Sequence, residues 1–312
     1  MRPLPRVVVV GPGGVAGFLG AQLVAAGIDT LFCARRGMDT LVVESPDPRC
    51  ATISRVHCVV DPGAVPPEWE SPDWVIVGVK AHQLDSALPW YERFRDADPS
   101  VAGLQNGVES VGRLAKLTGV RTVIPVLAYC GGETVRPGRI RHGGATLLVT
   151  RQDRAGTAFQ SLFASTAVQV QLSDDIVTEI WRKAIVNSAL NGVTALARRR
   201  MDVLHESGVA ELVRELMLEC WRVGVSCGAK LDVDEVGQRA ASLTAHATER
   251  STTSMYTDWV SGAQTEHDAI YGAVIRQAAA RGIDTPLHRA FAALLSAGSR
   301  SPHPHAPEPT SV

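Results

Sequence analysis

The pattern of hydrophobic and polar residues divides the chain into two parts of different character. In the N-terminal part, short apolar runs at residues 7–10, 30–34 and 74–79 alternate with stretches of helical periodicity. Apolar runs without polar alternation are typical of parallel strands that are buried on both faces. From residue 173 to about residue 298, strand-like runs stop and apolar residues recur every three or four positions. The pattern therefore predicts an α/β domain followed by an all-α domain.

The remaining pattern completes this division. Further strands are predicted at residues 101–104, 123–128, 145–150 and 168–172, with one more helix between the last two. Residues 37–73 contain many prolines and are poorly patterned, and residues 136–140 are expected to form a connection. We place the α/β domain at residues 1–172, the helical domain at residues 173–300, and a disordered, proline-rich tail at residues 301–312.

The first apolar run leads into a glycine-rich turn with the spacing of a dinucleotide-binding fingerprint. The pattern Gly11-x-Gly13-x-x-Ala16 follows a predicted strand and enters a predicted helix at about Val15. The first glycine permits a sharp turn, the second lets a pyrophosphate approach the backbone, and the third position keeps the helix close to the sheet. Free N–H groups at the helix start favour bound phosphate. We expect cofactor contacts at Gly11, Gly13, Gly14, Val15 and Ala16, and the alternative is a purely structural turn.

The end of the second predicted strand indicates which dinucleotide is bound. An NAD site usually carries an acidic residue there, which accepts a hydrogen bond from the ribose 2′-hydroxyl. This chain has Arg35 and Arg36 instead. A guanidinium matches a 2′-phosphate in charge and in bidentate geometry. We therefore predict NADP(H) with Arg35 at the phosphate, and the alternative is a solvated basic turn, as we expect for Arg36.

Two further polar residues follow predicted strands of the same domain. Lys80 comes after the apolar run at 74–79, and Asn106 follows the strand at 101–104. Ligands of open α/β sheets bind outside the carboxyl ends of the strands, so both residues are expected near cofactor or substrate. The alternatives are a surface lysine and an ordinary Asn-Gly turn.

The first long helix of the C-terminal part carries a polar stripe. Lys183, Asn187 and Asn191 stand four residues apart, among the apolar residues Ile185 and Leu190. Steps of four keep side chains on one helix face, with a rise of about 6 Å per step. Because asparagine is a poor helix former, two of them in mid-helix favour a binding role. The alternative is a solvated face.

A second polar cluster lies further along the helical part. Ser254 stands in the run STTSMYTD, and Glu266 stands in GAQTEHDAIYG, at the start of a predicted helix. Thr265 and Asp268 have the spacing of a capping box, which is the structural alternative for this motif. A lysine, a carboxylate, a serine and several amides together suit the reduction of a carbonyl in a small acid.

The composition narrows the remaining classes of function. The 31 basic and 32 acidic residues nearly cancel, so nothing favours a nucleic acid or an anionic membrane as partner. No apolar stretch reaches the length of a membrane span. The six cysteines and nine histidines show no metal-ligand spacing, so no metal is expected and the thiols are expected to be reduced in a cytoplasmic protein.

Taken together, these motifs resemble the ketopantoate reductase (2-dehydropantoate 2-reductase) family over about residues 6–298. The runs that carry the resemblance are GPGGVAGFLGAQLVAAG with Arg35, VGVKAHQ, LQNGV, WRKAIVNSALNGVTAL, STTSMYTD and GAQTEHDAIYG. The resemblance implies an N-terminal Rossmann domain of α/β type, an all-α C-terminal domain and an active site in the cleft between them. It also implies NADPH-dependent reduction of 2-dehydropantoate to (R)-pantoate, in pantothenate and coenzyme A synthesis, by a monomer or homodimer.

The resemblance assigns a role to each candidate residue. Lys183 matches the catalytic lysine that donates a proton, and Glu266 matches a glutamate that holds the substrate. Asn187, Asn191 and Ser254 match substrate-binding positions. Lys80 and Asn106 match residues near cofactor and substrate, and Arg35 matches the arginine that holds the 2′-phosphate.

The sequence departs from the family pattern at Ala16, at residues 41–62, at Thr253 and at His267. Because His267 follows Glu266 directly, the substrate is the part of the resemblance that these departures affect most. A related reductase of another small 2-oxo acid is the nearer alternative. A sensor that binds NADP(H) without turnover is the alternative from a different class. A flavin-binding oxygenase would need a longer chain and an acidic residue in place of Arg35.

Overall fold

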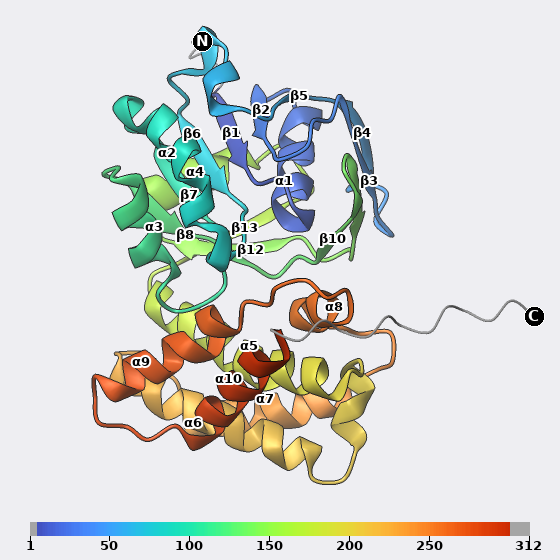
Figure 1. Ribbon diagram of the computed structural model, residues 1–312, viewed down its shortest axis with the longest axis vertical. Coiled ribbons are helices and arrows are strands. Elements are labelled where there is room, and N and C mark those ends of the chain that lie inside the picture. The colour runs from blue at the N-terminus through green and yellow to red at the C-terminus, as the bar shows by residue number, and fades with distance from the viewer. Residues whose placement is uncertain (1–4, 300–312) are drawn as a thin grey trace, which may run out of the picture. The chain divides into compact units, whose positions relative to one another are not determined.

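The computed structural model describes residues 5–299, which form two compact units (Figure 1). The first unit ends at Glu179 and the second begins at Ile180, within helix α5 (Ile176–Ala197). The first unit is built on a parallel α/β sheet and the second is helical, which confirms the predicted fold class. The boundary between the two units lies seven residues after the domain boundary that we expected at residue 172. The predicted tail at residues 301–312 lies outside the described residues.

The first unit is organised around a six-stranded parallel sheet. Its strands, in spatial order, are β5 (His57–Val59), β2 (Thr30–Cys33), β1 (Val7–Val10), β6 (Trp74–Val77), β7 (Ser100–Gly103) and β8 (Val123–Pro125). The chain starts at the centre, runs to one edge, returns to the centre and continues to the other edge. This is the strand order of a Rossmann sheet, whose topological switch point lies between β1 and β6.

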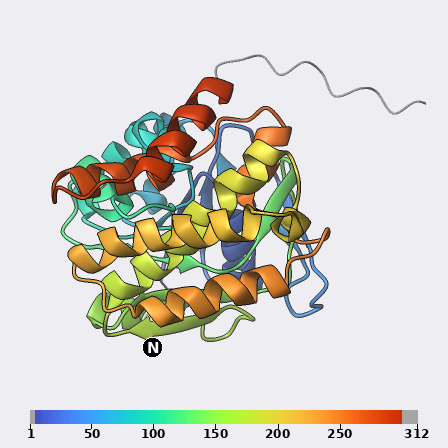
Figure 2. The same cartoon turned by 90° about the horizontal axis from the view of Figure 1, so that it is seen from below.

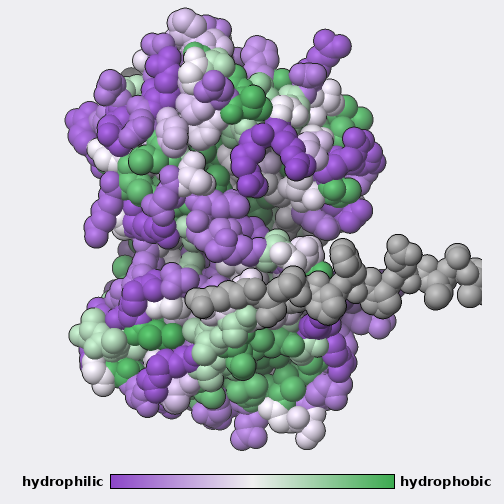
Figure 3. All heavy atoms as spheres, in the orientation of Figure 1, coloured by the Kyte–Doolittle hydropathy of each residue, from purple (hydrophilic) through white to green (hydrophobic). Residues whose placement is uncertain are grey.

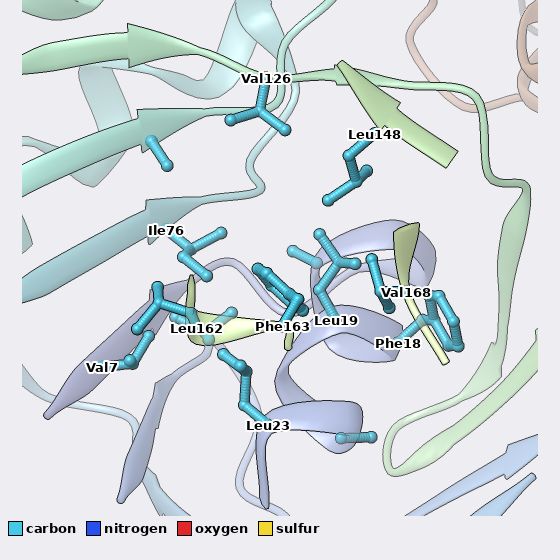
Figure 4. Close-up of a cluster of buried hydrophobic side chains, with 14 of the residues drawn as sticks. Val7, Phe18, Leu19, Leu23, Ile76, Val126, Leu148, Leu162, Phe163 and Val168 are labelled. Carbon is cyan, nitrogen blue, oxygen red and sulfur yellow. The ribbon is translucent and has the colours of Figure 1, made fainter. Parts of the chain in front are cut away.

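The four valines of β1 fill the core on both faces of this sheet. Val7 and Val9 join one buried cluster, whereas Val8 and Val10 join the other. Successive side chains of a strand point to opposite faces, so a strand buried on both faces has to be apolar throughout. Figure 4 shows the first cluster, in which Leu19 and Leu23 of α1 (Gly14–Ala25) lie toward the sheet with side chains of α4 (Arg154–Leu162) and the residues after it, whereas Phe18 lies on another side of α1 and stacks on His142. Helices α2 (Leu88–Phe94) and α3 (Ser110–Thr118) contribute to the second cluster.

A second sheet beside α1 was not expected from the sequence. It has the order β10 (Gly132–Arg136), β11 (Arg139–His142), β3 (Thr40–Glu44) and β4 (Thr52–Arg55), and it packs on α1. The poorly patterned residues 37–73, for which no strand was predicted, thus contain β3, β4 and β5. These strands are short and partly exposed, with Ile53 80% exposed, so they lack a clear apolar pattern. Within the expected connection at residues 136–140, only Pro137 and Gly138 form the turn of a hairpin, and Gly138 has a φ of +75°; the other three residues belong to β10 and β11.

The third sheet completes the first unit. It has the order β13 (Gln169–Ser173), β12 (Leu147–Arg151) and β9 (Leu127–Ala128). The predicted strands at 145–150 and 168–172 and the helix between them are confirmed. The single strand expected at 123–128 is in fact two strands, β8 and β9, which belong to different sheets.

The second unit contains only helices and turns among the residues that are described (Figure 2). After α5 its main elements are α6 (Val209–Ser226), α7 (Val233–Ala245), α8 (Ser254–Val260), a π-helical turn (Asp268–Gly272), α9 (Ala273–Ala279) and α10 (Pro286–Ser299). Leu216, Met217 and Tyr271 are fully buried in its core. The unit thus surrounds the C-terminal half of α5 with side chains that fix its position.

Candidate active site

The turn after β1 has the backbone geometry that its glycines predict. Gly11 has a φ of +72°, and a Cβ atom on it would lie 2.3 Å from Cγ1 of Val79. The Gly13 N–H donates to the Gly11 carbonyl at 2.7 Å, which closes the turn tightly. Only glycine satisfies both the left-handed backbone and the close approach of the chain after β6.

Gly13 faces open space at the start of α1. A Cβ atom on Gly13 would have no neighbour closer than 4.0 Å. Gly13 is the N-cap of α1, and no side chain accepts from the first N–H groups of this helix. Unsatisfied N–H groups at a helix start bind anions. The room in front of Gly13 therefore fits the pyrophosphate of a dinucleotide.

Gly14 and Ala16 also hold α1 in place by close packing. A Cβ atom on Gly14 would lie 1.9 Å from the carbonyl oxygen of Gly132 in β10. A Cβ atom on Gly78, directly after β6, would lie 2.1 Å from the Cβ of Ala16, which is 1% exposed. These positions keep the helix start against both sheets, and Val15 between them is partly buried.

Replacing Gly13 with alanine is expected to leave the fold intact and to weaken dinucleotide binding by at least about tenfold. The added methyl group would enter the space that the phosphates require. Fluorescence titration with NADPH and thermal unfolding measure the two effects. Gly112→Ala in α3 is the matched control, because its methyl group also meets nothing within 4 Å. Equal NADPH affinity in the two variants would contradict the assignment of Gly13 to the phosphates.

The other predicted cofactor residues lie at the carboxyl ends of neighbouring strands. Arg35 is exposed in the bend after β2, and no ion pair within residues 5–299 involves it. Lys80 is half-buried after β6, and Asn106 is half-buried after β7. The Gly11 N–H donates to the Cys33 carbonyl, and the Gly78 N–H donates to the Val10 carbonyl. These bonds hold the carboxyl ends of β2, β1 and β6 together. Ligands of such a sheet bind at this edge.

Gln105 is a residue of this edge to which the sequence assigned no role. Its side chain is buried, and its Nε2 group donates to the carbonyls of Val77 at 2.9 Å and Val79 at 2.8 Å. The two bonds fix the backbone between β6 and Lys80 to the residue before Asn106. A glutamine beside a strand end gives no signal in the sequence that distinguishes this clamp from an ordinary turn residue.

In the second unit, three of the predicted substrate residues line one hollow of about 310 Å³. Asn187 and Asn191 come from α5, and Ser254 is the first residue of α8. The other lining residues are Leu190, Met201, Ser251, Thr252 and Thr253. The volume is at the lower end of the range for small-molecule sites. One apolar wall and several amide and hydroxyl groups suit a small polar acid.

Asn191 and Thr253 fix the start of α8 to α5. The Asn191 Oδ1 atom accepts from the Met255 N–H at 3.2 Å. The Thr253 hydroxyl lies 2.7 Å from the Thr194 hydroxyl and accepts from the Tyr256 N–H as the N-cap of α8. Thr253 at the family's serine position therefore keeps a capping hydroxyl, as either residue type would.

Lys183 and Glu266 are not lining residues of this hollow. Lys183 is half-buried on α5, one turn before Asn187 on the same helix face. Glu266 lies immediately before the helix that begins at His267, and its carbonyl accepts from the Ile270 N–H at 3.1 Å. The predicted helix start is therefore displaced by one residue, and Glu266 stands at its entry.

The alternative of a capping box at Thr265 and Asp268 is wrong. The Thr265 hydroxyl lies 2.9 Å from Nδ1 of His267, and the Asp268 carboxylate accepts from Arg276 at 2.8 Å. Burial lowers the pKa of His267 below 6.5, although Asp268 opposes this effect. The His267 ring is thus held by Thr265 directly after Glu266, in surroundings that favour its neutral form.

Other site classes receive no support from the described residues. Within residues 5–299, no three His, Cys, Asp or Glu side chains are placed to hold a metal ion, and no helix there is long and apolar enough to cross a membrane. The six cysteines are free thiols. Figure 3 shows hydrophobic residues gathered on one face of the second unit. A homodimer stays a prediction.

Solved structures of several proteins share this fold over nearly the whole chain. A ketopantoate reductase from Ralstonia eutropha matches with a TM-score of 0.84 at 27% identity, over 94% of this chain and 98% of that one. A reductase from Staphylococcus aureus, described as dimeric, matches with a TM-score of 0.83 at 24% identity, over 94% and 98%. A D-mandelate dehydrogenase with NADH and anilino(oxo)acetate matches with a TM-score of 0.83 at 21% identity, over the same shares.

Sequence comparison gives the same result over nearly the full length. A 2-dehydropantoate 2-reductase of Caulobacter vibrioides is 32% identical over 95% of this chain and 100% of its own length. One of Mycobacterium tuberculosis is 34% identical over 95% and 98%. The model of the ketopantoate reductase PanE/ApbA family matches residues 7–152, and that of its C-terminal domain matches residues 175–299. This chain therefore belongs to the ketopantoate reductase PanE/ApbA family of oxidoreductases.

Proposed function

We propose that this protein reduces 2-dehydropantoate to (R)-pantoate with NADPH, in pantothenate and coenzyme A synthesis. The observation that carries the proposal is the polar face of α5, where Lys183 is followed by two amides that line a hollow with Ser254. Relatives of near full length from two bacteria are named 2-dehydropantoate 2-reductase. The family uses NAD(P)H, and the turn at Gly11 and Gly13 fits such a cofactor.

The proposed roles follow from the chemistry of each group. Bound NADPH supplies the hydride that reduces the keto carbon. The Lys183 ammonium gives its proton to the keto oxygen, so that the ketone becomes an alcohol. The Asn191 oxygen is bonded to the Met255 N–H, so its NH₂ group is the end that donates to the substrate carboxylate. Asn187 and Ser254 complete the binding of the acid, and Glu266 holds its hydroxyl group.

The preference for NADPH is proposed from Arg35. Arg35→Asp is expected to weaken NADPH binding by about 10- to 100-fold, because the 2′-phosphate loses a guanidinium and meets a carboxylate. NADH binding is expected to change little. Titration of both cofactors checks this, with Arg36→Asp as the matched control on the neighbouring exposed residue. A similar loss of affinity for NADPH and NADH would contradict the assignment of Arg35 to the 2′-phosphate.

A second candidate substrate class is favoured by a specific observation. A D-mandelate dehydrogenase shares the fold, and His267 follows Glu266 where the family has an aliphatic residue. A reductase of another small 2-oxo acid would use the same lysine and amides. A sensor without turnover would have no need of Lys183 and Glu266.

The test is oxidation of NADPH and of NADH by the purified protein with 2-dehydropantoate and a panel of other 2-oxo acids. The highest kcat/KM with NADPH and 2-dehydropantoate supports the proposal. If the protein reduces only a different 2-oxo acid, the proposed substrate is wrong and the proposed residue roles stand. NADPH binding without turnover of any acid would favour the sensor.

A further inference from the structure

The phenol of Tyr271 is inserted into the backbone of α5. Its hydroxyl donates to the Ser188 carbonyl at 2.5 Å and accepts from the Gly192 N–H at 2.8 Å. In a regular α-helix this N–H and this carbonyl, four residues apart, pair with each other. A Cβ atom on residue 192 would lie 2.1 Å from the phenol oxygen, so Gly192 leaves the space for it. The backbone of α5 is thus bridged at this turn by a side chain from another element.

The bridged turn is the one that separates the two amides of the hollow. Asn187 immediately precedes Ser188, and Asn191 immediately precedes Gly192. A group inserted between a helical carbonyl and its N–H changes the local direction of the helix. The orientation of Asn191 relative to Asn187 and Lys183 therefore depends on the hydroxyl of Tyr271.

Tyr271 is also close in sequence to Glu266. Tyr271 belongs to the π-helical turn Asp268–Gly272, and the helix that contains this turn begins directly after Glu266. Such turns hold an extra residue and are frequent at functional sites. Both partners of the phenol are backbone groups of α5. The two hydrogen bonds therefore fix the position of the π-helical turn along α5, independently of the surrounding side chains.

The ring of Tyr271 is also fixed, because it is buried and packed against other rings. Tyr271 is 0% exposed, and its ring stacks on Phe291 of α10 with centroids 5.8 Å apart. The His288 ring lies 5.6 Å away. Burial raises the pKa of the Tyr271 phenol far above its usual range, so the hydroxyl remains a donor throughout the working pH range.

We propose that Tyr271 is a positioning residue for the reduction: its inserted hydroxyl fixes the Glu266 segment against the helix that carries Lys183, Asn187 and Asn191. The inference rests on the proposed function, because it assigns those four residues to one reaction. Tyr271 touches neither substrate nor cofactor in this scheme, and it acts through the backbone of α5.

The experiment compares Tyr271→Phe with Tyr91→Phe. Each variant loses one hydroxyl from a buried ring, but the Tyr91 hydroxyl has no hydrogen-bond partner among residues 5–299. Steady-state kinetics are measured at saturating NADPH with the best 2-oxo acid of the wild type. The measurements are repeated with NADPH that carries deuterium at the transferred position. Circular dichroism at the assay temperature gives the folded fraction of each variant.

Tyr271→Phe is expected to lower kcat by about 10- to 100-fold, as misplacement of reacting groups does. The isotope effect on kcat is expected to rise, because the chemical step becomes slower than product release. Tyr91→Phe is expected to keep the wild-type kcat and isotope effect. A merely structural role would lower the folded fraction and leave the isotope effect unchanged.

Two results would overturn the inference in different ways. If the wild type is active and Tyr271→Phe keeps its kcat per folded molecule and its isotope effect, Tyr271 has no positioning role and the proposed function stands. If the wild type reduces no 2-oxo acid, the proposed function fails and the inference fails with it.

Discussion

Lys183→Ala is expected to lower kcat by about 10²- to 10⁴-fold, which is the usual contribution of a general acid. The methyl group of alanine cannot give a proton to the keto oxygen, and the developing negative charge loses its ammonium partner. Because Lys183 lies on α5 of the second unit and the glycine turn belongs to the first, the Kd of NADPH is expected to stay nearly unchanged. Single-turnover kinetics and a titration with NADPH measure the two quantities separately.

Lys116→Ala provides the matched control for this variant. Lys116 is exposed in the last turn of α3, so the same change of charge and size is made away from the candidate site. Its kcat is expected to equal that of the wild type. Two results would contradict the proton-donor role of Lys183. One is a loss of NADPH affinity as large as the loss of kcat, and the other is a wild-type kcat.

Much of the fold could be predicted because burial leaves a direct mark on the sequence. Val7–Val10 are apolar on both faces, since α1 covers one face of the sheet and α2 and α3 cover the other. Gly11 marks a turn that other residues cannot form without strain, and Gly13 leaves open space in front of the helix start. The stripe of Lys183 and the two asparagines marks a helix face that is neither core nor solvent.

The parts that the sequence did not reveal depend on contacts between distant segments. β3 and β4 are half-exposed strands; β4 pairs with β3, and β3 pairs with β11, which lies about a hundred positions further along the chain. Tyr271 has the sequence pattern of an ordinary core aromatic, because nothing in its neighbourhood shows that its hydroxyl enters another helix. The tightness of Gly14 against Gly132 is likewise visible only when β10 lies beside α1.

The second unit depends for its stability on a buried carboxylate, and Glu219→Ala is expected to lower the free energy of unfolding by about 3–5 kcal/mol. Glu219 on α6 is 3% exposed. Its oxygens accept from the Leu287 N–H at 3.1 Å, from the His288 N–H at 2.8 Å and from Nδ1 of His288 at 2.7 Å. Alanine would leave three buried donors at the start of α10 without an acceptor. Differential scanning calorimetry measures the loss.

The effect should depend on pH in one direction. Burial alone would raise the pKa of Glu219, but the hydrogen bonds from the His288 ring and from the two backbone N–H groups lower it overall, below 4.5. A carboxyl whose pKa is lower in the folded state stabilises the fold above its ordinary pKa. This contribution is lost as the pH falls through the folded-state pKa. The difference between wild type and Glu219→Ala is therefore full at neutral pH and decreases in acid.

Glu215→Ala is the control, because it makes the same substitution one turn earlier on α6. The Glu215 side chain is 43% exposed and pairs with Arg214, so its loss is expected to cost at most about 1 kcal/mol. Equal stability of the two variants at neutral pH, or a Glu219→Ala deficit that persists undiminished in acid, would show that the start of α10 is held by packing and not by the carboxylate.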